Sequence, residues 1–279
     1  MGFNNRLIST VGASAAPNPF NADVYLDPAQ LPASGSVSEW SNSGTNAHVA
    51  TLVGNTGSMT VGTLDSAKCA ISSFEGSYSV AAYGWAMNPS GTTGLNNYSL
   101  YNTQQDWSFY GFYAASSDHN TNLAYPHTIL IGGSTGSSSS DLNNTFLQAI
   151  WREGLSYSHY VYTQLYDSGG SQVTQSTTNN TTLIATPYPE WFGIGLTWEY
   201  NPSGTSNLKM YVNGALSFTY TVTGTQGQTS NSLGFGATYN DVFNEGGMYF
   251  GDQNWFANTL KSDSEILAIH NYFKADYGL

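Results

Sequence analysis

Three successive runs in the second half of the chain constrain the fold most, because each alternates apolar and polar residues. The runs are 192–200, 208–212 and 216–222, and Asn213 and Gly214 lie between the last two. Successive side chains of a β-strand point to opposite faces, so the alternation places the apolar residues of each run on one side. An Asn-Gly pair between such runs is typical of a tight hairpin. The pattern therefore predicts a three-stranded antiparallel meander with one buried face.

The length of the Asn-Gly loop decides which residues share that face. A two-residue loop places Val212 opposite Ala215 and leaves the two apolar rows on opposite faces. A three-residue loop, 213–215, places Val212 opposite Leu216 and merges the rows. Because burial favours merged rows, the sequence predicts the three-residue loop, with Gly214 in the left-handed conformation and a bulge.

The same register, extended to the first run, predicts which residues face the core. Its inner rows are Tyr200–Leu208–Tyr220, Trp198–Met210–Phe218 and Leu196–Val212–Leu216. The outer face then carries Tyr211, and an acid, Glu199, lies beside a base, Lys209. We expect the inner residues to form a core and the outer ones to remain at the surface.

The composition is typical of an all-β protein that works at a surface. The chain has 279 residues, of which 9% are charged, and it contains 30 Gly and 20 Tyr. Its formal net charge of −12 argues against nucleic acid and anionic membranes as partners. No apolar run reaches the about 18 residues of a membrane-spanning helix. We expect a single sandwich domain over 21–279, preceded by an N-terminal arm over 1–20.

The arm and the cysteine content suggest where the protein is made. Residues 1–17 loosely imitate a signal peptide but are too polar for one. Cys69 has no partner for an internal disulfide, and a buried strand position is predicted for it. A surface-like composition without a signal peptide or disulfides fits a virion protein, which is made in a reducing cytoplasm. The arm holds too little apolar surface to order by itself, so it would pair with the sandwich's own edge or with a neighbouring chain. We favour an added strand on a neighbouring chain, because particle assembly also explains the missing signal peptide and disulfides.

One helix is predicted, over 262–278. It opens with a capping box formed by Ser262 and Glu265, and it ends at Gly278. An apolar stripe with helical spacing would pack against the sandwich; it consists of Ile266, Ile269, Phe273 and Tyr277. His270 lies beside the stripe and is expected at the edge of the core.

Several segments of the chain resemble one family. WFGIGLTWEY, LKMYVNGAL and MYFGDQNWFANTLKSDSEILAIHNYF, all within 185–278, resemble the second half of a laminin-G-like, concanavalin A-like lectin/glucanase sandwich. DVYLDPAQLPASGSVSEWSNSG resembles the family's first strand and its Trp-containing turn. The resemblance implies a jelly-roll β-sandwich of two antiparallel sheets that binds carbohydrate or protein and less often hydrolyses glycans. Such modules also occur in bacteriophage head decorations, fibres and adhesins.

The sequence predicts no enzyme. Hydrolytic members of the family carry a Glu-x-Asp-x-(x)-Glu strand, which is missing here, and Glu190 and Glu199 lie nine positions apart in opposite phase. The GGSTG motif around Ser134 matches a nucleophile elbow, but a loop-like SSSSDLNN follows it instead of a helix. The histidines show no metal-ligand spacing; they are His48, His119, His127, His159 and His270. No catalytic residue is therefore predicted.

Calcium remains an open alternative. Some members of the family bind calcium through Asp, Asn and carbonyl oxygens in rim loops, so the resemblance implies Asp241, Asn244, Glu245 and Asp252 as candidate ligands. Their spacing matches no known calcium motif, and loop Asp and Asn are more often turn formers. We therefore expect no obligatory cofactor.

A recognition surface is the leading functional hypothesis. Four aromatic residues lie out of phase with the apolar rows or in runs that are aromatic in both phases, and they are candidates for binding a glycan or a protein; they are Trp107, Tyr110, Trp191 and Tyr211. The alternative is that these rings pack under loops or against a neighbouring subunit. The expected role is a multi-copy or homo-oligomeric bacteriophage surface protein, either a capsid decoration or a tail or fibre component, whose arm contacts other virion proteins. A cellular or secreted lectin is second, and a hydrolase third.

Overall fold

The structure is a computed structural model, and it describes fourteen stretches of the chain. These are residues 18–45, 50–53, 59–72, 84–87, 101–102, 105–115, 126–132, 147–153, 159–166, 172–179, 191–223, 229–230, 233–235 and 248–279. The predicted arm lies outside them except for residues 18–20. In several strands only the backbone is described, and the core that can be followed side chain by side chain belongs mainly to one sheet.

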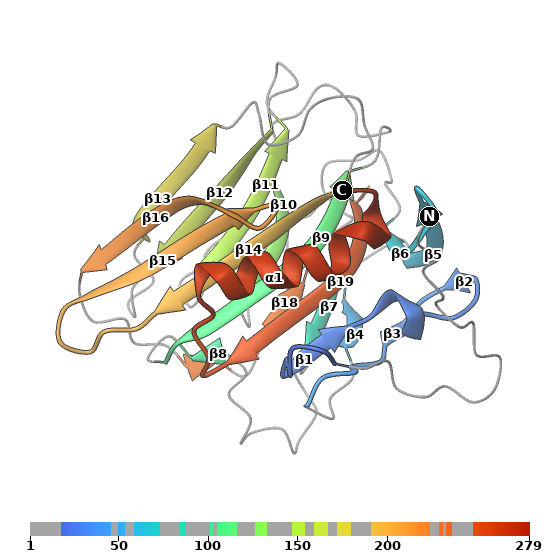
Figure 1. The fold of residues 1–279 in the computed structure, drawn as a ribbon, viewed down its shortest axis with the longest axis horizontal. Helices are drawn as coiled ribbons and strands as arrows, with labels where there is room; N and C mark the ends of the chain where they lie inside the picture. Colours follow the sequence, from blue (N-terminus) through green and yellow to red (C-terminus); the bar gives the residue numbers. More distant parts are fainter. Residues whose placement is uncertain are drawn as a thin grey trace.

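Two large antiparallel sheets form the body of the molecule (Figure 1). The nine-stranded sheet runs in the order β16 (Ala215–Thr223), β15 (Thr205–Val212), β14 (Phe192–Glu199), β9 (Trp107–Ala115), β19 (Met248–Ala257), β6 (Ala67–Ser72), β5 (Met59–Leu64) and β2 (Gly35–Ser36), with β1 (Val24–Leu26) also paired to β19. The eight-stranded sheet runs in the order β13 (Gln172–Asn179), β12 (His159–Tyr166), β11 (Leu147–Glu153), β10 (Pro126–Gly132), β18 (Leu233–Phe235), β7 (Gly84–Met87), β4 (Ala50–Val53) and β3 (Glu39–Trp40). A small third sheet pairs β8 (Tyr101–Asn102) with β17 (Thr229–Ser230).

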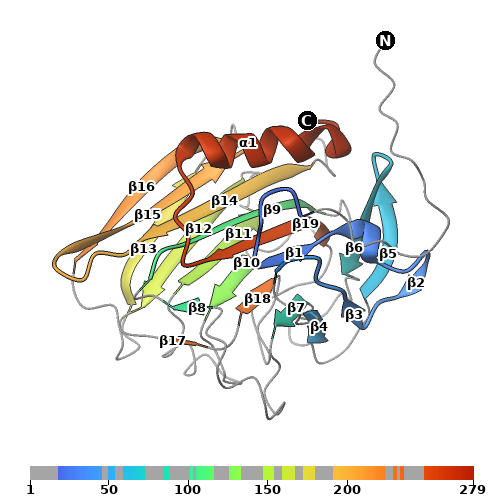
Figure 2. The same cartoon turned by 60° about the horizontal axis from the view of Figure 1, so that its bottom comes forward.

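The helical segments are short. In the part of the chain that the structure describes, they are the 3₁₀ turn η1 (Pro28–Gln30), the helix α1 (Asp263–Phe273) and the 3₁₀ turn η3 (Lys274–Tyr277). Figure 2 shows α1 lying across one face of the nine-stranded sheet, with the eight-stranded sheet on the opposite side. The predicted all-β class with one C-terminal helix is therefore confirmed. No helix among the described residues has the length and apolarity needed to cross a membrane.

The predicted meander is formed by β14, β15 and β16, but the first pairing is offset. Leu208 pairs with Trp198 rather than with Tyr200. The offset arises because β15 begins at Thr205, three residues before the predicted start. A shift of two residues keeps every side chain on its predicted face, because the period of a strand is two.

The predicted three-residue hairpin loop is wrong. Val212 pairs with Ala215, so the loop is the two-residue Asn213-Gly214, with φ of 48° and 77°. Positive φ at both positions is what a two-residue type I′ turn requires. The apolar rows still merge, because a bulge in β16 resets the register.

The bulge lies next to the turn. Tyr211 pairs with Leu216 and Met210 pairs with Phe218, so Ser217 is the extra residue of β16. The predicted Met210–Phe218 pairing is therefore present, as is Leu208 opposite Tyr220. Leu216, however, lies on the outer face and is 44% exposed instead of facing the core. Three other predicted inner residues, Tyr200, Phe218 and Tyr220, are half-buried rather than buried.

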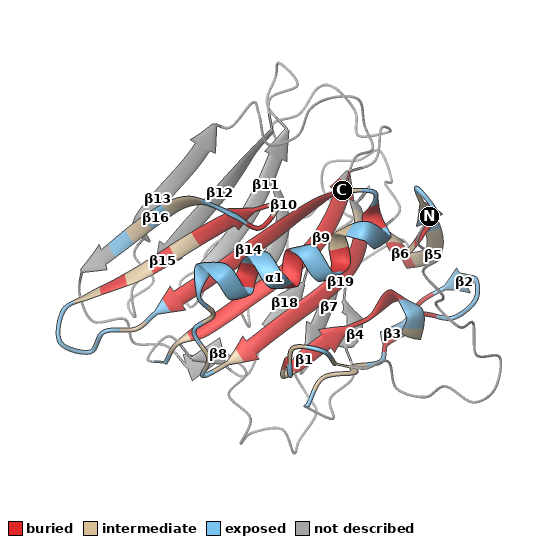
Figure 3. Ribbon diagram, viewed as in Figure 1, coloured by how far each residue is buried: buried red, intermediate tan, exposed pale blue. Residues whose placement is uncertain are grey.

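The central strands of the nine-stranded sheet are buried on both faces (Figure 3). In β14 every residue from Phe192 to Trp198 is buried, and in β15 both Met210 and Tyr211 are fully buried. The part of the outer face around Tyr211, which was expected to be at the surface, is covered by α1. A sheet that is covered on both sides does not show the apolar-in, polar-out pattern that the meander suggested.

The C-terminal helix matches its prediction closely. Ser262 caps it and forms a capping box with Glu265, and Gly278 ends the segment with a φ of 71°. The whole predicted stripe is buried; its members are Ile266, Ile269, Phe273 and Tyr277. These side chains join Tyr110, Phe112 and Tyr211 in one apolar cluster between the helix and the sheet.

Two smaller expectations can also be followed. Cys69 is a free, fully buried thiol in β6, as predicted, and burial raises its pKa to about 12. Phe20, at the end of the predicted arm, lies with its ring edge-on to Tyr272 and tilted against Phe273. The junction between the arm and the sandwich therefore packs on α1.

Candidate functional site

The four aromatic residues predicted to form a recognition surface are core residues instead. Trp107, Tyr110, Trp191 and Tyr211 are each 0–1% exposed. Trp107 stacks on Trp255 with ring centroids 5.0 Å apart. The other three belong to the cluster beneath α1. The prediction was wrong because the alternation of residues shows which side chains lie on the second face of the sheet, but it does not show that a helix covers this face.

Two of these aromatic residues fix the helix by their hydroxyl groups. The Tyr211 hydroxyl donates to Asp263 Oδ1 at 2.8 Å, at the first turn of α1. The Tyr110 hydroxyl is hydrogen-bonded to His270 Nδ1 at 2.9 Å, near its last turn. His270 is 5% exposed, as expected for the core edge, and burial, followed by Lys274, lowers its pKa to about 4. These side chains position the helix and are not available to a ligand.

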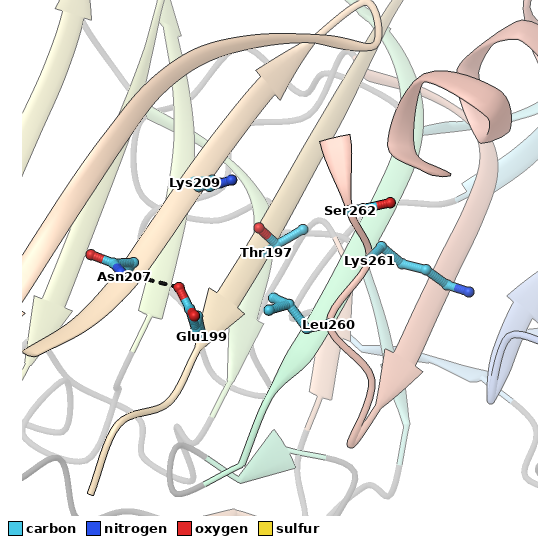
Figure 4. A pocket seen from close by; sticks show the side chains of 7 residues that line it. All are labelled: Thr197, Glu199, Asn207, Lys209, Leu260, Lys261 and Ser262. Carbon is cyan, nitrogen blue, oxygen red and sulfur yellow. Dashed lines mark hydrogen bonds between the residues drawn. The ribbon is translucent and has the colours of Figure 1, made fainter. Parts of the chain in front are cut away.

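A surface pocket lies next to the start of α1 (Figure 4). Its volume is about 210 Å³, and its lining residues come from β14, β15 and the segment between β19 and α1. They are Thr197, Glu199, Asn207, Lys209, Leu260, Lys261 and Ser262. The strand residues all lie on the outer face of the sheet, at the end that α1 leaves uncovered.

Hydrogen bonds hold the strand side of the pocket in place. The Asn207 side-chain amide donates to Glu199 Oε2 at 3.1 Å across the β14–β15 pair. The same amide group accepts from the Thr221 hydroxyl of β16 at 3.2 Å. Three adjacent strands thus orient one exposed carboxylate, which leaves Glu199 prearranged at the rim.

The helix side of the pocket is anchored from β9. The Ser108 hydroxyl donates to the Thr259 carbonyl at 2.9 Å and accepts from the Lys261 amide at 2.8 Å. This holds Leu260, which is 39% exposed, as the apolar wall of the pocket. Lys261 places its ammonium 4.6 Å from the centre of the Phe256 ring.

Charges of both signs surround the pocket. Lys209 Nζ lies 2.8 Å from Asp263 Oδ1, and Lys261 Nζ lies 3.5 Å from Glu265 Oε1. The hydrogen bond from Lys209, and then that from Tyr211, lower the pKa of Asp263, so this carboxylate stays ionised. A neutral, hydrogen-bonding ligand suits such a balanced surface better than a strongly charged one.

The lining residues offer several groups that can hydrogen-bond a ligand. They combine hydroxyl, amide, carboxylate and ammonium groups with one apolar side chain, and Glu199 is the only carboxylate among them. Small-ligand sites typically hold a few converging polar groups beside an apolar wall. The sequence named Glu199 and Lys209 only as an outer-face pair. The sequence showed that these two residues share a face of the sheet. It did not show that α1 leaves this end of the face uncovered.

The remaining sequence candidates do not assemble into a site. Asp252 is 3% exposed and accepts hydrogen bonds from Tyr25 and Tyr277. Within the stretches that the structure describes, no group of three or more His, Cys, Asp or Glu residues is arranged to hold a metal ion. The other candidates lie outside the described residues or side chains; they are Asp241, Asn244, Glu245, Ser134, Glu190, His48, His119, His127 and His159.

Comparison with known proteins finds similarity in the fold alone. No protein-family model matches the sequence, and no curated protein matches it. Among solved structures, the receptor-binding domain of botulinum neurotoxin C/D mosaic serotype aligns with a TM-score of 0.57 and 18% identity, over 90% of this chain and 51% of that one. The serotype D binding domain gives 0.56 and 17%, over 90% and 52%, and the type G receptor-binding domain 0.55 and 13%, over 90% and 51%.

The chain thus spans about half the length of these structures. Identities this low carry the fold and nothing about ligand or activity. What this chain shares with the toxin binding domains is a β-sandwich architecture.

Proposed function

We propose that this chain is a non-catalytic recognition module that binds a carbohydrate in the pocket between β14, β15 and the start of α1. The observation that carries the proposal is the pocket itself, in which an oriented Glu199 and Asn207 face an apolar Leu260. Solved structures that share the fold are named as receptor-binding domains, and extending a binding role to this chain is a fold-level analogy. The family resemblance of 185–278 adds the finer proposal of a lectin-like jelly roll.

The chemistry of the pocket suits a sugar. Sugar hydroxyls both donate and accept hydrogen bonds, so Glu199 and Asn207 match them as acceptor and as donor. The C–H face of a sugar ring is apolar and would lie against Leu260. A volume of about 210 Å³ is below the about 300–1,000 Å³ of pockets for drug-sized ligands, so the pocket fits one sugar residue of a chain.

A binding role without hydrolysis follows from the carboxylates. Glycoside hydrolysis needs two carboxyl groups, about 5 Å apart for retention or about 6.5–9.5 Å apart for inversion. The pocket is lined by one, Glu199, while Asp263 beside it is engaged by Lys209 and Tyr211. We therefore propose that glycans bound here are not cleaved.

We further propose a bacteriophage virion surface as the setting, either a capsid decoration or a tail or fibre component. The support is the surface-like composition together with the buried, unpaired thiol of Cys69, which suits a protein made in a reducing cytoplasm. Residues 1–20 would contact other virion proteins. A cellular or secreted lectin is the alternative, and detection of the protein in purified particles separates the two.

A glycan array followed by calorimetry tests the binding role. We expect the wild-type protein to bind a defined set of glycans, and Glu199→Ala to weaken that binding at least about tenfold, the loss of one charge-assisted hydrogen bond. Glu39→Ala is the matched control, because Glu39 is also an exposed strand glutamate but lies in the other sheet. Absence of glycan binding by the wild type, or equal binding by Glu199→Ala, would contradict the proposal.

A further inference from the structure

Among the described residues, the large apolar side chains that are most exposed all lie on the side of the molecule that carries α1. Leu267 and Tyr272 belong to the helix and are 44% and 54% exposed, and Leu216 of β16 is 44% exposed. The fourth, Leu260, forms the wall of the pocket. Large apolar side chains that gather on one face of a protein mark a contact with another molecule.

The hairpin tip joins these side chains into one surface. A Cβ atom at Gly214 would lie 3.0 Å from Leu267 Cδ1, so the turn that leads to Leu216 lies against the helix beside Leu267. Between Leu267 and Tyr272 the helix exposes two smaller residues, Ala268 and Asn271. We call this surface the helix face; it consists of Leu216, Leu267, Ala268, Asn271 and Tyr272. Figure 3 shows the outer side of α1 exposed along the helix.

The middle of the helix face is shaped for close approach. Ser264, Ala268 and Asn271 are exposed and recur every three or four residues, so they form one row along α1. The row lies opposite the buried Ile266 and Ile269. Because its side chains are small, a second helix can approach α1 at the short end of the about 8–10 Å that separates packed helices.

The basic residues of the chain are concentrated around this face. Lys209, Lys261 and Lys274 are three of the six Lys and Arg residues, and they lie on β15, before α1 and after it. They are accompanied by Glu199, Asp263, Glu265 and Asp276. The other charged side chains that the structure describes are one base, Lys68, and acids only; these are Asp23, Asp27, Glu39, Asp65, Asp106 and Asp252.

We propose that the helix face is the contact for a second copy of this chain, in a two-fold symmetric dimer whose two α1 helices pack against each other antiparallel. The argument for a second copy is charge. Each chain carries a formal net charge of −12, so two copies repel each other over most of their surfaces. Repulsion is weakest at the helix face, where lysines offset the acids. This contact does not depend on the carbohydrate site.

The antiparallel direction follows from the charges at the two ends of α1. Parallel helices would place the acidic first turn, with Asp263 and Glu265, beside the same turn of the other copy. Antiparallel helices place it beside the turn that carries Lys274, and their dipoles then oppose each other favourably. A two-fold axis between Ala268 and Asn271 brings Leu267 of each copy to the level of Tyr272 of the other. The face is therefore complementary to itself, as a two-fold contact requires.

Analytical ultracentrifugation of the full chain tests the dimer. We expect wild-type protein to pass from monomer to dimer between about 1 and 200 µM, the range of an interface of modest size. Leu267→Glu should weaken the dimer at least about tenfold, because it brings an unpaired carboxylate into an apolar contact. Ser38→Glu is the matched control, since Ser38 is also exposed but lies beside β3 of the other sheet, and it should dimerise like the wild type.

The dependence on salt tests the charge argument separately. Raising NaCl from about 10 to about 150 mM shortens the Debye length from about 30 to about 8 Å and screens the repulsion between the two acidic chains. We therefore expect the dimer to become more stable over this range. A dimer that weakens as salt is added would contradict the proposed balance of charges at the contact.

A disulfide cross-link locates the contact on the molecule. The native Cys69 is fully buried, so an added cysteine is the reactive one. A disulfide requires the two Cα atoms to lie within about 7 Å, which antiparallel helices centred on the helix face allow at position 268. Under mild oxidation Ala268→Cys should form a covalent dimer, and Ser38→Cys should remain monomeric.

Four results would overturn the proposal. They are a wild-type protein that stays monomeric over the whole concentration range, a dimer that Leu267→Glu leaves unchanged, equal cross-linking of Ala268→Cys and Ser38→Cys, and a protein that dimerises only after deletion of residues 2–17. The last result would show that the N-terminal segment of the same chain occupies the helix face in place of a second copy.

Discussion

The contacts of Tyr110 show how a single residue determines packing in the interior of this protein. Its side chain occupies the space next to two positions of β14 that have no side chain, Gly193 and Gly195. Its hydroxyl then reaches His270 on α1. Alternate glycines in a strand indicate close approach of another group, so the sequence WFGIGLTWEY carried this signal. The signal did not say that the approaching group was Tyr110, and that residue was therefore expected at the surface.

Gly193→Ala tests this contact. A Cβ atom at Gly193 would lie 2.3 Å from the Tyr110 hydroxyl oxygen, so the ring must shift and the bond to His270 is lost. We expect a loss of about 1–3 kcal/mol in the free energy of unfolding, measured with urea. Gly204→Ala is the control, because its nearest neighbour would be 3.5 Å away, and it should change stability little. Equal stability of both variants would show that the Tyr110 ring can move aside without lowering the free energy of unfolding.

At the scale of secondary-structure elements, features encoded within a few residues could be predicted from the sequence. Contacts between elements could not. The helix could be predicted from Ser262 to Gly278 because a capping box and a left-handed terminal glycine are encoded within a few residues. The hairpin loop could not, because its tip packs on the helix. A Cβ atom at Gly214 would lie 2.8 Å from His270 Cβ. The two-residue turn and the bulge fit that contact, which no local pattern reveals.

The cap of α1 gives a prediction at this scale. Ser262→Ala removes the hydroxyl that accepts from the Glu265 amide at 3.3 Å and should lower the free energy of unfolding by about 1 kcal/mol. Ser203→Ala, which changes an exposed serine in the loop between β14 and β15, is the control and should change it by less than about 0.5 kcal/mol. Thermal unfolding of both variants distinguishes the outcomes. A control variant as unstable as Ser262→Ala would contradict the assignment of the cap.

At the scale of the molecule, two buried groups respond to pH in opposite directions. His270 has a pKa lowered to about 4 from 6.5, so the stability it contributes is present above about pH 6.5 and is lost as pH falls towards 4. Asp252 has a pKa raised to about 7 from 3.8, so its contribution is present below about pH 4 and is lost as pH rises towards 7. Between about pH 4 and 6.5 the two effects oppose each other.

Removing either group should therefore reveal the other. In Asp252→Asn the free energy of unfolding should rise with pH between 4.5 and 6.5, by at most about 1.4 kcal/mol per unit. In His270→Gln it should fall with pH over the same range, while the wild type changes less than either variant. Urea unfolding at three pH values measures all three slopes. If the free energy of unfolding changed with pH in the same direction in both variants, the opposing effects of His270 and Asp252 would be refuted.

The place of β19 in the sheet has a consequence for how the chain is made. This strand pairs with β9, β6 and β1, so it occupies the middle of the nine-stranded sheet although it follows all the other strands in the chain. During synthesis on the ribosome, β9, β6 and β1 emerge before β19, so the edges that pair with β19 remain unpaired until it has been made. Unpaired strand edges can form hydrogen bonds with other chains, and pairing between strands far apart in the sequence is slow. We expect the sheet to close only after β19 has been synthesised, so that a stalled or shortened chain is a substrate for chaperones rather than a smaller version of the fold.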